Sequence, residues 1–143
     1  MNPSEKALYQ AASEARKTSY SPYSEVQVGA AIRLTNGRIF SGCNVENSSY
    51  GGTVCAERVA IFKAVSETNT EGSPKPQIEA VMVVTDASPP WPPCGLCRQI
   101  IAEFAQNSTP VITANLKGEV NTYTFKELFP DSFNPSHLLG RKR

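Results

Sequence analysis

Residues 78–116 read IEAVMVVTDASPPWPPCGLCRQIIAEFAQNSTPVITANL. This stretch begins and ends with apolar runs of strand length, IEAVMVVTD at 78–86 and PVITANL at 110–116. The segment between them carries apolar residues at helical spacing: Cys97, Ile100, Ile101, Phe104 and Ala105. A strand, a helix and a second strand in this order predict a β-α-β crossover, in which the two strands are parallel.

The segments before this crossover predict a helix, a hairpin and a second helix. Asn2 and Glu5 have capping-box spacing around Pro3, so a helix should begin there. VQVGAAIRL at 26–34 and RIFSGCNVE at 38–46 are β-rich runs joined by Asn36-Gly37, which predicts adjacent antiparallel strands with a type I′ turn. CAERVAIFKAVS at 55–66 is apolar almost all round and predicts a largely buried helix.

After the crossover, NTYT at 121–124 predicts a last short strand, and Thr124 with Glu127 forms another capping box for a final helical turn. The order of helices and strands places the chain in the α/β class. We expect a three-layer α-β-α sandwich with a mixed five-stranded sheet.

Composition limits the possible partners. The 143 residues fit one domain, 1–143, and the net charge is +1 with 19% charged residues. Because no large basic field is present, we expect neither a nucleic-acid partner nor a membrane surface. The N-terminus is too polar for a signal peptide, so we expect a soluble cytoplasmic protein, with residues 141–143 in a flexible tail. In that reducing compartment the four cysteines favour metal binding or catalysis over disulfides.

Cys55, Cys94 and Cys97 fall at predicted helix starts, where the partial positive charge of a helix N-terminus stabilises thiolates. Cys94-x-x-Cys97 alone could be a redox pair or half of a structural zinc site. If Cys55 supplies a third ligand, the fourth tetrahedral position stays open for water, as in a catalytic zinc site. We expect Cys43 to be a buried free thiol, with a fourth ligand as the alternative, and His137 to be a bystander.

Two charged residues follow Cys55 directly. Glu57 lies on an otherwise apolar helix, where it either moves protons beside a metal-bound water or is simply an exposed first-turn glutamate. Arg58 could hydrogen-bond to the thiolates and offset their charge, or it could join a surface ion pair.

CAER at 55–58 with PCGLCR at 93–98 resembles the zinc-dependent cytidine deaminase family, in its small homotetrameric form with three cysteine ligands. The resemblance extends over YSPYSEVQVGAA at 20–31, NGRIFSGCNVENSSY at 36–50 and ELFPDSFNP at 127–135, in the order of the family. It therefore covers nearly the whole chain.

The resemblance implies hydrolytic deamination of cytidine and 2′-deoxycytidine to uridine and 2′-deoxyuridine, with release of ammonia, as a step of pyrimidine salvage. It assigns one Zn²⁺ per chain to Cys55, Cys94 and Cys97. A zinc-bound hydroxide would attack C4 while Glu57 shuttles protons, and Arg58 would hydrogen-bond to the ligand sulfurs.

The resemblance also implies which residues bind the substrate. Asn44 and Glu46 would hold the ribose hydroxyls, and both side chains can share one face of a strand end. Ala56 and Tyr50 would line the pocket, and Phe133 would reach the site of a neighbouring subunit in a homotetramer.

One position departs from the family pattern. Val26 stands where phenylalanine is usual, which removes one aromatic contact with the pyrimidine. Trp91 could substitute for that ring, or it could simply pack its proline-rich loop.

Three other functions stay open at this point. A polynucleotide deaminase would need basic and aromatic surface for a strand. An antibiotic nucleoside deaminase would not be expected to keep the whole NVEN pattern at 44–47. A non-catalytic zinc module or a redox protein would need only the cysteines. Thiolates favour zinc, although their spacing does not exclude iron.

Overall fold

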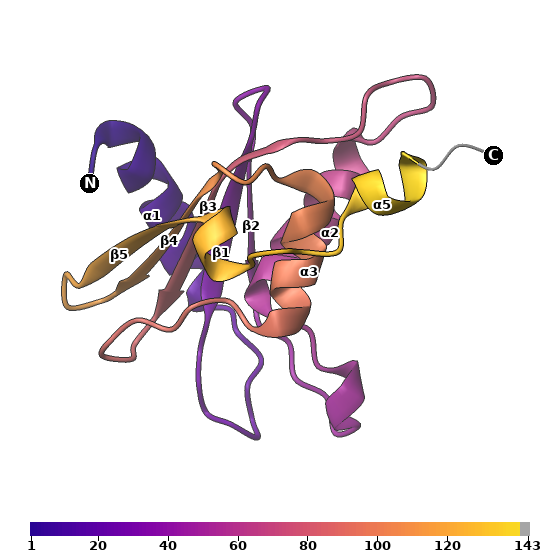
Figure 1. Cartoon of the computed structure of the whole chain (residues 1–143). Helices are drawn as coiled ribbons and strands as arrows, with labels where there is room; N and C mark the ends of the chain where they lie inside the picture. Colours follow the sequence, from indigo (N-terminus) through magenta and orange to yellow (C-terminus); the bar gives the residue numbers. More distant parts are fainter. Residues whose placement is uncertain (141–143) are drawn as a thin grey trace.

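The computed structural model describes residues 1–140, so the predicted tail at 141–143 lies outside the described residues. A five-stranded sheet in the order β2-β1-β3-β4-β5 runs through the middle of the molecule (Figure 1). The β3–β4 pair is parallel and the other pairs are antiparallel, which confirms the mixed sheet. The strands are β1 (Gly29–Leu34), β2 (Ile39–Cys43), β3 (Ile78–Thr85), β4 (Pro110–Asn115) and β5 (Val120–Thr124).

The predicted crossover is confirmed. Strand β3 leads through α3 (Gly95–Phe104) into β4, and the parallel register runs from Val81 opposite Val111 to Thr85 opposite Asn115. Strand β3 is buried at every position except Glu79, as expected for a strand covered on both faces. The α3 N-terminus therefore follows the carboxyl end of β3, the edge at which α/β sheets bind ligands.

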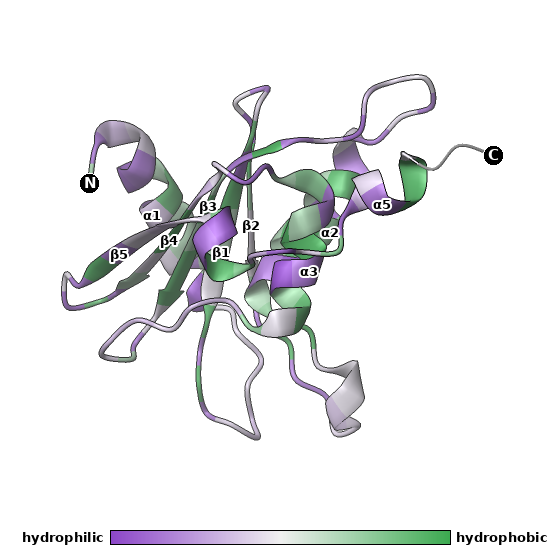
Figure 2. Cartoon of the chain, in the orientation of Figure 1, coloured by the Kyte–Doolittle hydropathy of each residue, from purple (hydrophilic) through white to green (hydrophobic). Residues whose placement is uncertain are grey.

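Helices cover both faces of the sheet, so the three layers are confirmed (Figure 1). On one face α1 (Pro3–Arg16) packs against β1, β2 and β3, with Leu8 and Ala12 buried on Met82. On the other face α2 (Ala56–Thr68) and α3 bury Ile61 and Ile101. Figure 2 shows hydrophobic residues along the central strands and the helix faces turned toward them.

Two glycines let the helices approach the sheet closely. A Cβ at Gly29 would lie 1.9 Å from the Ala12 carbonyl oxygen of α1. A Cβ at Gly42 would lie 2.7 Å from the Ala60 nitrogen and 2.9 Å from the Ala56 carbonyl oxygen of α2. Since real Cβ atoms do not approach backbone so closely, Gly42 helps to set the position of the α2 N-terminus, where the site begins.

The β1–β2 hairpin is present, but its predicted type I′ turn is wrong. Gly37 has φ +89°, whereas Asn36 does not adopt the left-handed conformation that type I′ requires. The Gly37 N–H donates to the Leu34 carbonyl at 2.9 Å, and the Leu34 N–H donates to the Arg38 carbonyl at 2.9 Å. Residues 35–37 therefore form a three-residue hairpin loop, in which Gly37 adopts the left-handed conformation at the end of the turn.

The helix ends follow their local signals. Capping boxes form at Asn2 with Glu5 and at Thr124 with Glu127, so both predictions are confirmed. The second one begins the short helix α4 (Phe125–Leu128). A further short helix, α5 (Pro135–Leu139), was not predicted, although Asn134 as N-cap before a proline is its sequence signal. Among residues 1–140, no helix combines the length and the apolarity needed to cross a membrane.

Candidate active site

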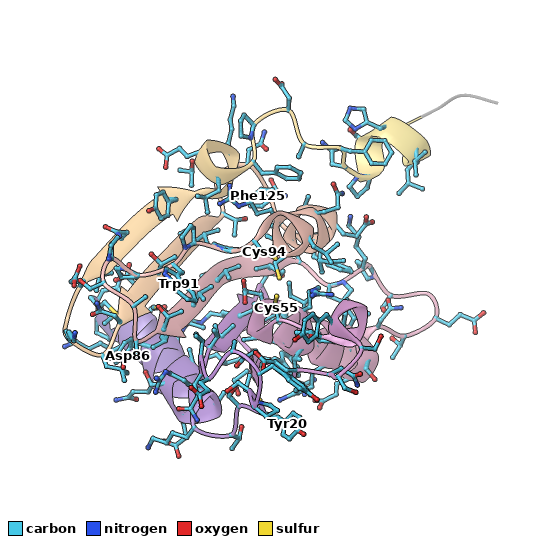
Figure 3. The ribbon with its side chains drawn as sticks, turned by 90° about the horizontal axis from the view of Figure 1, so that it is seen from below. Tyr20, Cys55, Asp86, Trp91, Cys94 and Phe125 are labelled. Atoms are coloured by element: carbon cyan, nitrogen blue, oxygen red, sulfur yellow. The ribbon has the colours of Figure 1, made fainter. Side chains whose placement is uncertain are left out.

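Three cysteines meet where the N-termini of α2 and α3 come together. Cys55 is the N-cap of α2, Cys94 is the N-cap of α3, and Cys97 lies in the first turn of α3. Their sulfur atoms all lie within 4.8 Å of one another, and the Cys55 and Cys94 Sγ atoms are 3.9 Å apart. Figure 3 shows Cys55 and Cys94 close together between the two helices.

This sulfur geometry fits a zinc ion. Tetrahedral ligands about 2.3 Å from zinc stand about 3.8 Å from one another, close to the Cys55–Cys94 separation. Within the part of the chain that the structure describes, no other group of His, Cys, Asp or Glu residues gathers three ligand atoms so closely. Cys43 and His137 are not part of the cluster. Three thiolates would leave one position of the metal free for another ligand.

The cluster favours one anionic thiolate even without a metal. A hydrogen bond from the Cys97 thiol, aided by Arg58 and Cys94, lowers the pKa of Cys55 to about 5. Conversely, sharing its proton with Cys55 raises the pKa of Cys97 above its ordinary value. The Arg58 Nη2 donates to the Cys55 sulfur at 3.6 Å and to the Thr53 carbonyl at 3.3 Å. Arg58 therefore lies where its charge can offset that of the thiolates.

Glu57 lies in the first turn of α2 with only 4% of its surface exposed, so it is not the exposed first-turn glutamate that we considered. Burial, reinforced by the negative charge of Cys55, raises the pKa of its carboxyl to about 7. A carboxyl with this pKa can both take up and release a proton near neutral pH.

A cavity of about 320 Å³ opens beside the sulfur atoms. Of the residues that the sequence singled out, the cavity is lined by Val26, Asn44, Glu46, Cys55, Ala56, Glu57, Trp91 and Cys94. Sequence reasoning missed further lining residues: Ser24, Val28, Thr53, Val83, Thr85 and Pro92. A larger depression of about 550 Å³, between the end of α3 and residues 132–136, has no cysteine in its lining and lies away from this chemistry.

Asn44 fixes the loop that forms one wall of this cavity. Its Oδ1 accepts hydrogen bonds from the Val28 N–H at 2.9 Å and from the Ser19 hydroxyl, and its Nδ2 donates to the Val26 carbonyl at 2.8 Å. Because the Asn44 side chain is buried, these bonds hold Val26 and Val28 against the cavity.

Glu46 is held at the cavity mouth as an anion. Its carboxylate accepts hydrogen bonds from the Tyr23 N–H at 2.9 Å, the Ser24 N–H at 3.1 Å and the Ser24 hydroxyl. The Ser24 hydroxyl contributes most to lowering the pKa of Glu46 below its ordinary value. The sequence signal for this role of Ser24 was weak, since a serine in the segment 20–24, which contains a Ser-Pro pair, is typical of any loop.

Tyr50 and Phe133 do not line the cavity of their own chain. Tyr50 is 77% exposed and borders an adjoining hollow, where its ring meets that of Tyr23 edge-on at 5.9 Å. Phe133 is exposed and stacks on His137 at 5.3 Å, while its carbonyl accepts a hydrogen bond from Gln99 Nε2 at 2.8 Å. The role of Phe133 in a neighbouring subunit stays a prediction.

Comparisons with known proteins agree with this geometry. The family described as "Cytidine and deoxycytidylate deaminase zinc-binding region" matches residues 2–113. A cytidine deaminase of Sporosarcina psychrophila is 46% identical over 125 residues, covering 87% of this chain and 88% of that protein. One from Halalkalibacterium halodurans is 44% identical and covers 92% of this chain and 95% of that protein.

Solved structures show the same likeness in three dimensions. The cytidine deaminase of Burkholderia pseudomallei superposes with a TM-score of 0.81 at 41% identity, covering 90% of this chain and 98% of that one. The enzyme of Mycobacterium tuberculosis gives a TM-score of 0.73 at 32% identity, covering 90% and 96% of the two chains.

Proposed function

Because the chain belongs to the cytidine and deoxycytidylate deaminase family, we propose that it hydrolyses cytidine and 2′-deoxycytidine to uridine and 2′-deoxyuridine, releasing ammonia. The observation that carries this proposal is the position of Glu57. A carboxyl buried beside three sulfur atoms that could hold a metal, at the wall of a cavity, suits proton transfer during hydrolysis, a role that a purely structural zinc site does not require.

Cys55, Cys94 and Cys97 would hold one Zn²⁺ per chain, and the bound ion would supply a water acidified to near-neutral pKa. Glu57 would accept a proton from that water and return it to the departing amine, which its pKa of about 7 favours. Arg58 would donate to the Cys55 sulfur and so reduce the negative charge of the thiolates.

Asn44 and Glu46 would orient the sugar at the other end of the cavity. The Glu46 carboxylate, kept ionised by Ser24, can accept hydrogen bonds from sugar hydroxyls. The amide of Asn44 still has one N–H beyond the bond to Val26, and that N–H can donate to a hydroxyl. Val26 and Ala56 would contact the nucleoside as wall residues.

The remaining proposals concern the assembly and its setting. We expect a homotetramer in which Phe133 borders the cavity of a neighbouring subunit, because Phe133 is exposed and does not line the cavity of its own chain. Tyr50 would meet the substrate from the hollow that adjoins the cavity of its own chain. The chain would act as one deaminase domain in the cytoplasm, recovering free nucleosides in pyrimidine salvage.

The test is the loss of ultraviolet absorbance on deamination, measured with cytidine, 2′-deoxycytidine and a short cytosine-containing oligonucleotide. Turnover of both nucleosides, but not of the oligonucleotide, together with one zinc per chain, is the expected result. Turnover of the oligonucleotide alone would indicate a polynucleotide deaminase. Zinc binding with no turnover of any of the three would contradict the proposal and favour a non-catalytic zinc module.

A further inference from the structure

Trp91 occupies a place in the cavity that the proposed chemistry leaves unused. It is the only tryptophan of the chain and lies in the loop between β3 and α3, three residues before Cys94. Its side chain is 49% exposed, yet it lines the same cavity as Glu57 and Cys94. Figure 3 labels Trp91 in the same region as Cys55 and Cys94. A large aromatic ring half open to water, beside a reactive centre, is positioned to be covered by a ligand.

We propose that Trp91 is a substrate-binding residue that stacks on the pyrimidine ring, and that a polar clasp, formed by Asn115 and Glu119 at the β4–β5 turn, holds its loop in the stacking position. This inference rests on the proposed function, since it assumes that a nucleoside enters the cavity. It concerns a residue and a distant turn to which the proposed reaction assigns no role.

The chemistry of the cavity wall favours a stacking role. Among the described residues that line the cavity, Trp91 is the one aromatic residue; the other apolar side chains there are aliphatic and offer no aromatic face to a ring: Val26, Val28, Ala56, Val83 and Pro92. The groups proposed to handle protons and sugar hydroxyls, Glu57, Glu46 and Asn44, are polar and do not stack on a ring. An indole face is the largest flat surface that a side chain offers, and stacking on it is worth a large factor in nucleobase binding.

Hydrogen bonds connect the β4–β5 turn to the start of the Trp91 loop, at Ala87 and Ser88. The Ser88 hydroxyl donates to the Glu119 carboxylate, which also accepts from Asn115 Nδ2 at 3.1 Å. The same Nδ2 donates to the Ala87 carbonyl at 3.0 Å, so Asn115 contacts the loop directly. Asn115 is 1% exposed, and its Oδ1 accepts from the Glu119 N–H at 3.0 Å. A buried side chain with all of these bonds is a rigid anchor.

The other end of the loop is held as well. The Arg98 Nε donates to the Pro93 carbonyl at 2.8 Å, and Arg98 Nη1 donates to the Leu128 carbonyl at 2.6 Å. Pro92 and Pro93 restrict the backbone immediately after Trp91. Trp91 thus lies between two anchored points of its loop, at residues 87–88 and at Pro93.

Substitution of Trp91 is the first test. Trp91→Ala should lower kcat/KM for cytidine about 5- to 100-fold, mainly through KM, because stacking contributes to binding of the ring. Cytidine and 2′-deoxycytidine should be affected equally, since the contact is to the base. Trp91→Phe keeps an aromatic face and should stay within about threefold of wild type. Zinc content and Tm should not change in either variant.

Phe62→Ala is the matched control, because Phe62 is 47% exposed and lies outside the cavity lining. The KM of Phe62→Ala for cytidine should equal that of wild type. An unchanged KM in Trp91→Ala would overturn the proposal. So would a raised KM that comes with lost zinc or a lowered Tm, because this pattern would assign Trp91 to packing of its loop.

The single tryptophan also supplies a direct binding signal. Titration of the zinc-loaded protein with uridine, the product, should change the Trp91 emission in a saturable way. No change at concentrations of uridine that inhibit turnover would overturn the contact. If wild type does not deaminate cytidine, the proposed function fails, whereas titration with cytidine still reports whether a pyrimidine nucleoside contacts Trp91. The two failures are thereby distinguishable.

The clasp is tested through Ser88 and Glu119, which act by positioning Trp91. Ser88→Ala and Glu119→Ala should each raise KM about two- to tenfold with kcat unchanged, as expected for loss of the hydrogen bond between these two side chains. Ser88→Thr retains a hydroxyl and should restore KM. Lys117→Ala, in the same turn but with no side-chain bond to the loop, is the control. If the variants at Ser88 and Glu119 all have the KM of wild type, the clasp does not position Trp91 and this part of the proposal is overturned.

Discussion

The Cys55 and Cys94 sulfur atoms lie 3.9 Å apart, although the two residues are 39 positions apart in the chain. Cys55 is the N-cap of α2 and Cys94 is the N-cap of α3, and the whole of β3 lies between these helices in sequence. A shared metal would therefore tie two helix N-termini together over the carboxyl end of the central strand.

Removal of the metal should accordingly destabilise the fold. Zinc-stripped protein is expected to melt at a lower temperature than the zinc-loaded protein, because a ligand that binds only the folded state adds about 4 kcal/mol at a thousandfold excess over its Kd. Thermal unfolding with and without added zinc measures this difference. Cys94→Ser should abolish the zinc-dependent shift, whereas Cys43→Ser, outside the cluster, should preserve it. Equal Tm values with and without zinc would contradict the assignment.

Glu57→Gln should retain one zinc per chain and lose deamination by about a hundredfold to ten-thousandfold, because the amide keeps the shape of the side chain but cannot accept and return a proton. Steady-state rates together with metal content measure both properties. Glu67→Gln, at an exposed position of the same helix, should behave as wild type. Near-normal turnover of Glu57→Gln would end the proton-transfer role.

Glu57 should also make the stability of the metal-free protein depend on pH. Burial raises its pKa from 4.5 to about 7, so the protonated form favours the folded state. This contribution is fully present below pH 4.5 and is lost as the pH rises through 7. At 1.36 kcal/mol per pH unit, the loss amounts to about 3 kcal/mol.

The measurement is urea unfolding of metal-free wild type and Glu57→Gln between pH 4.5 and pH 8. The free energy of unfolding of wild type should fall relative to that of the variant by about 3 kcal/mol over this range. Cys55 also titrates here, with its pKa lowered to about 5, but it is common to both proteins and does not enter their difference directly. If the free energies of unfolding of the two proteins change in parallel with pH, burial does not raise the pKa of the Glu57 carboxyl.

Phe133→Ala should raise KM for cytidine if its ring borders the site of a neighbouring subunit. A contact of this kind is worth about 0.5 to 1.5 kcal/mol, or roughly two- to tenfold in KM. Because Phe133 also stacks on His137, His137→Ala is the control that removes this partner and leaves the phenylalanine in place. An unchanged KM in Phe133→Ala, measured in the same assembly state, would remove Phe133 from the site.

Local signals in the sequence predicted most of the fold correctly. The crossover at 78–116 was readable because its strands must be apolar on both faces, and the capping boxes at Asn2 and Thr124 depend on neighbours three residues away. The predicted type of the hairpin turn was wrong because the pair Asn36-Gly37 is compatible with more than one type of turn. The strand register, set by the pairing of Arg33 with Ile39, selected the three-residue loop.

The candidate site was predicted unevenly. Cys94 and Cys97 are separated by one helical turn, so their proximity is local, and the helix starts at Cys55 and Cys94 followed from the same reasoning. The family resemblance pointed to Asn44 and Glu46. Ser24, which holds Glu46, was missed, because a loop serine shows no preference for a partner 22 residues away until the chain is folded.

The sequence by itself therefore determined the elements and the thiol chemistry, since helix starts, strand patterns and ligand types are properties of short segments. Only the tertiary structure decided that Cys55 lies within reach of Cys94, that Glu57 is buried and that Trp91 lines the cavity. The physical reason is that each of these features requires segments joined by the sheet. The close approach of α2 at Gly42 and the anchoring of the 86–93 loop by Asn115 come from packing between distant parts of the chain.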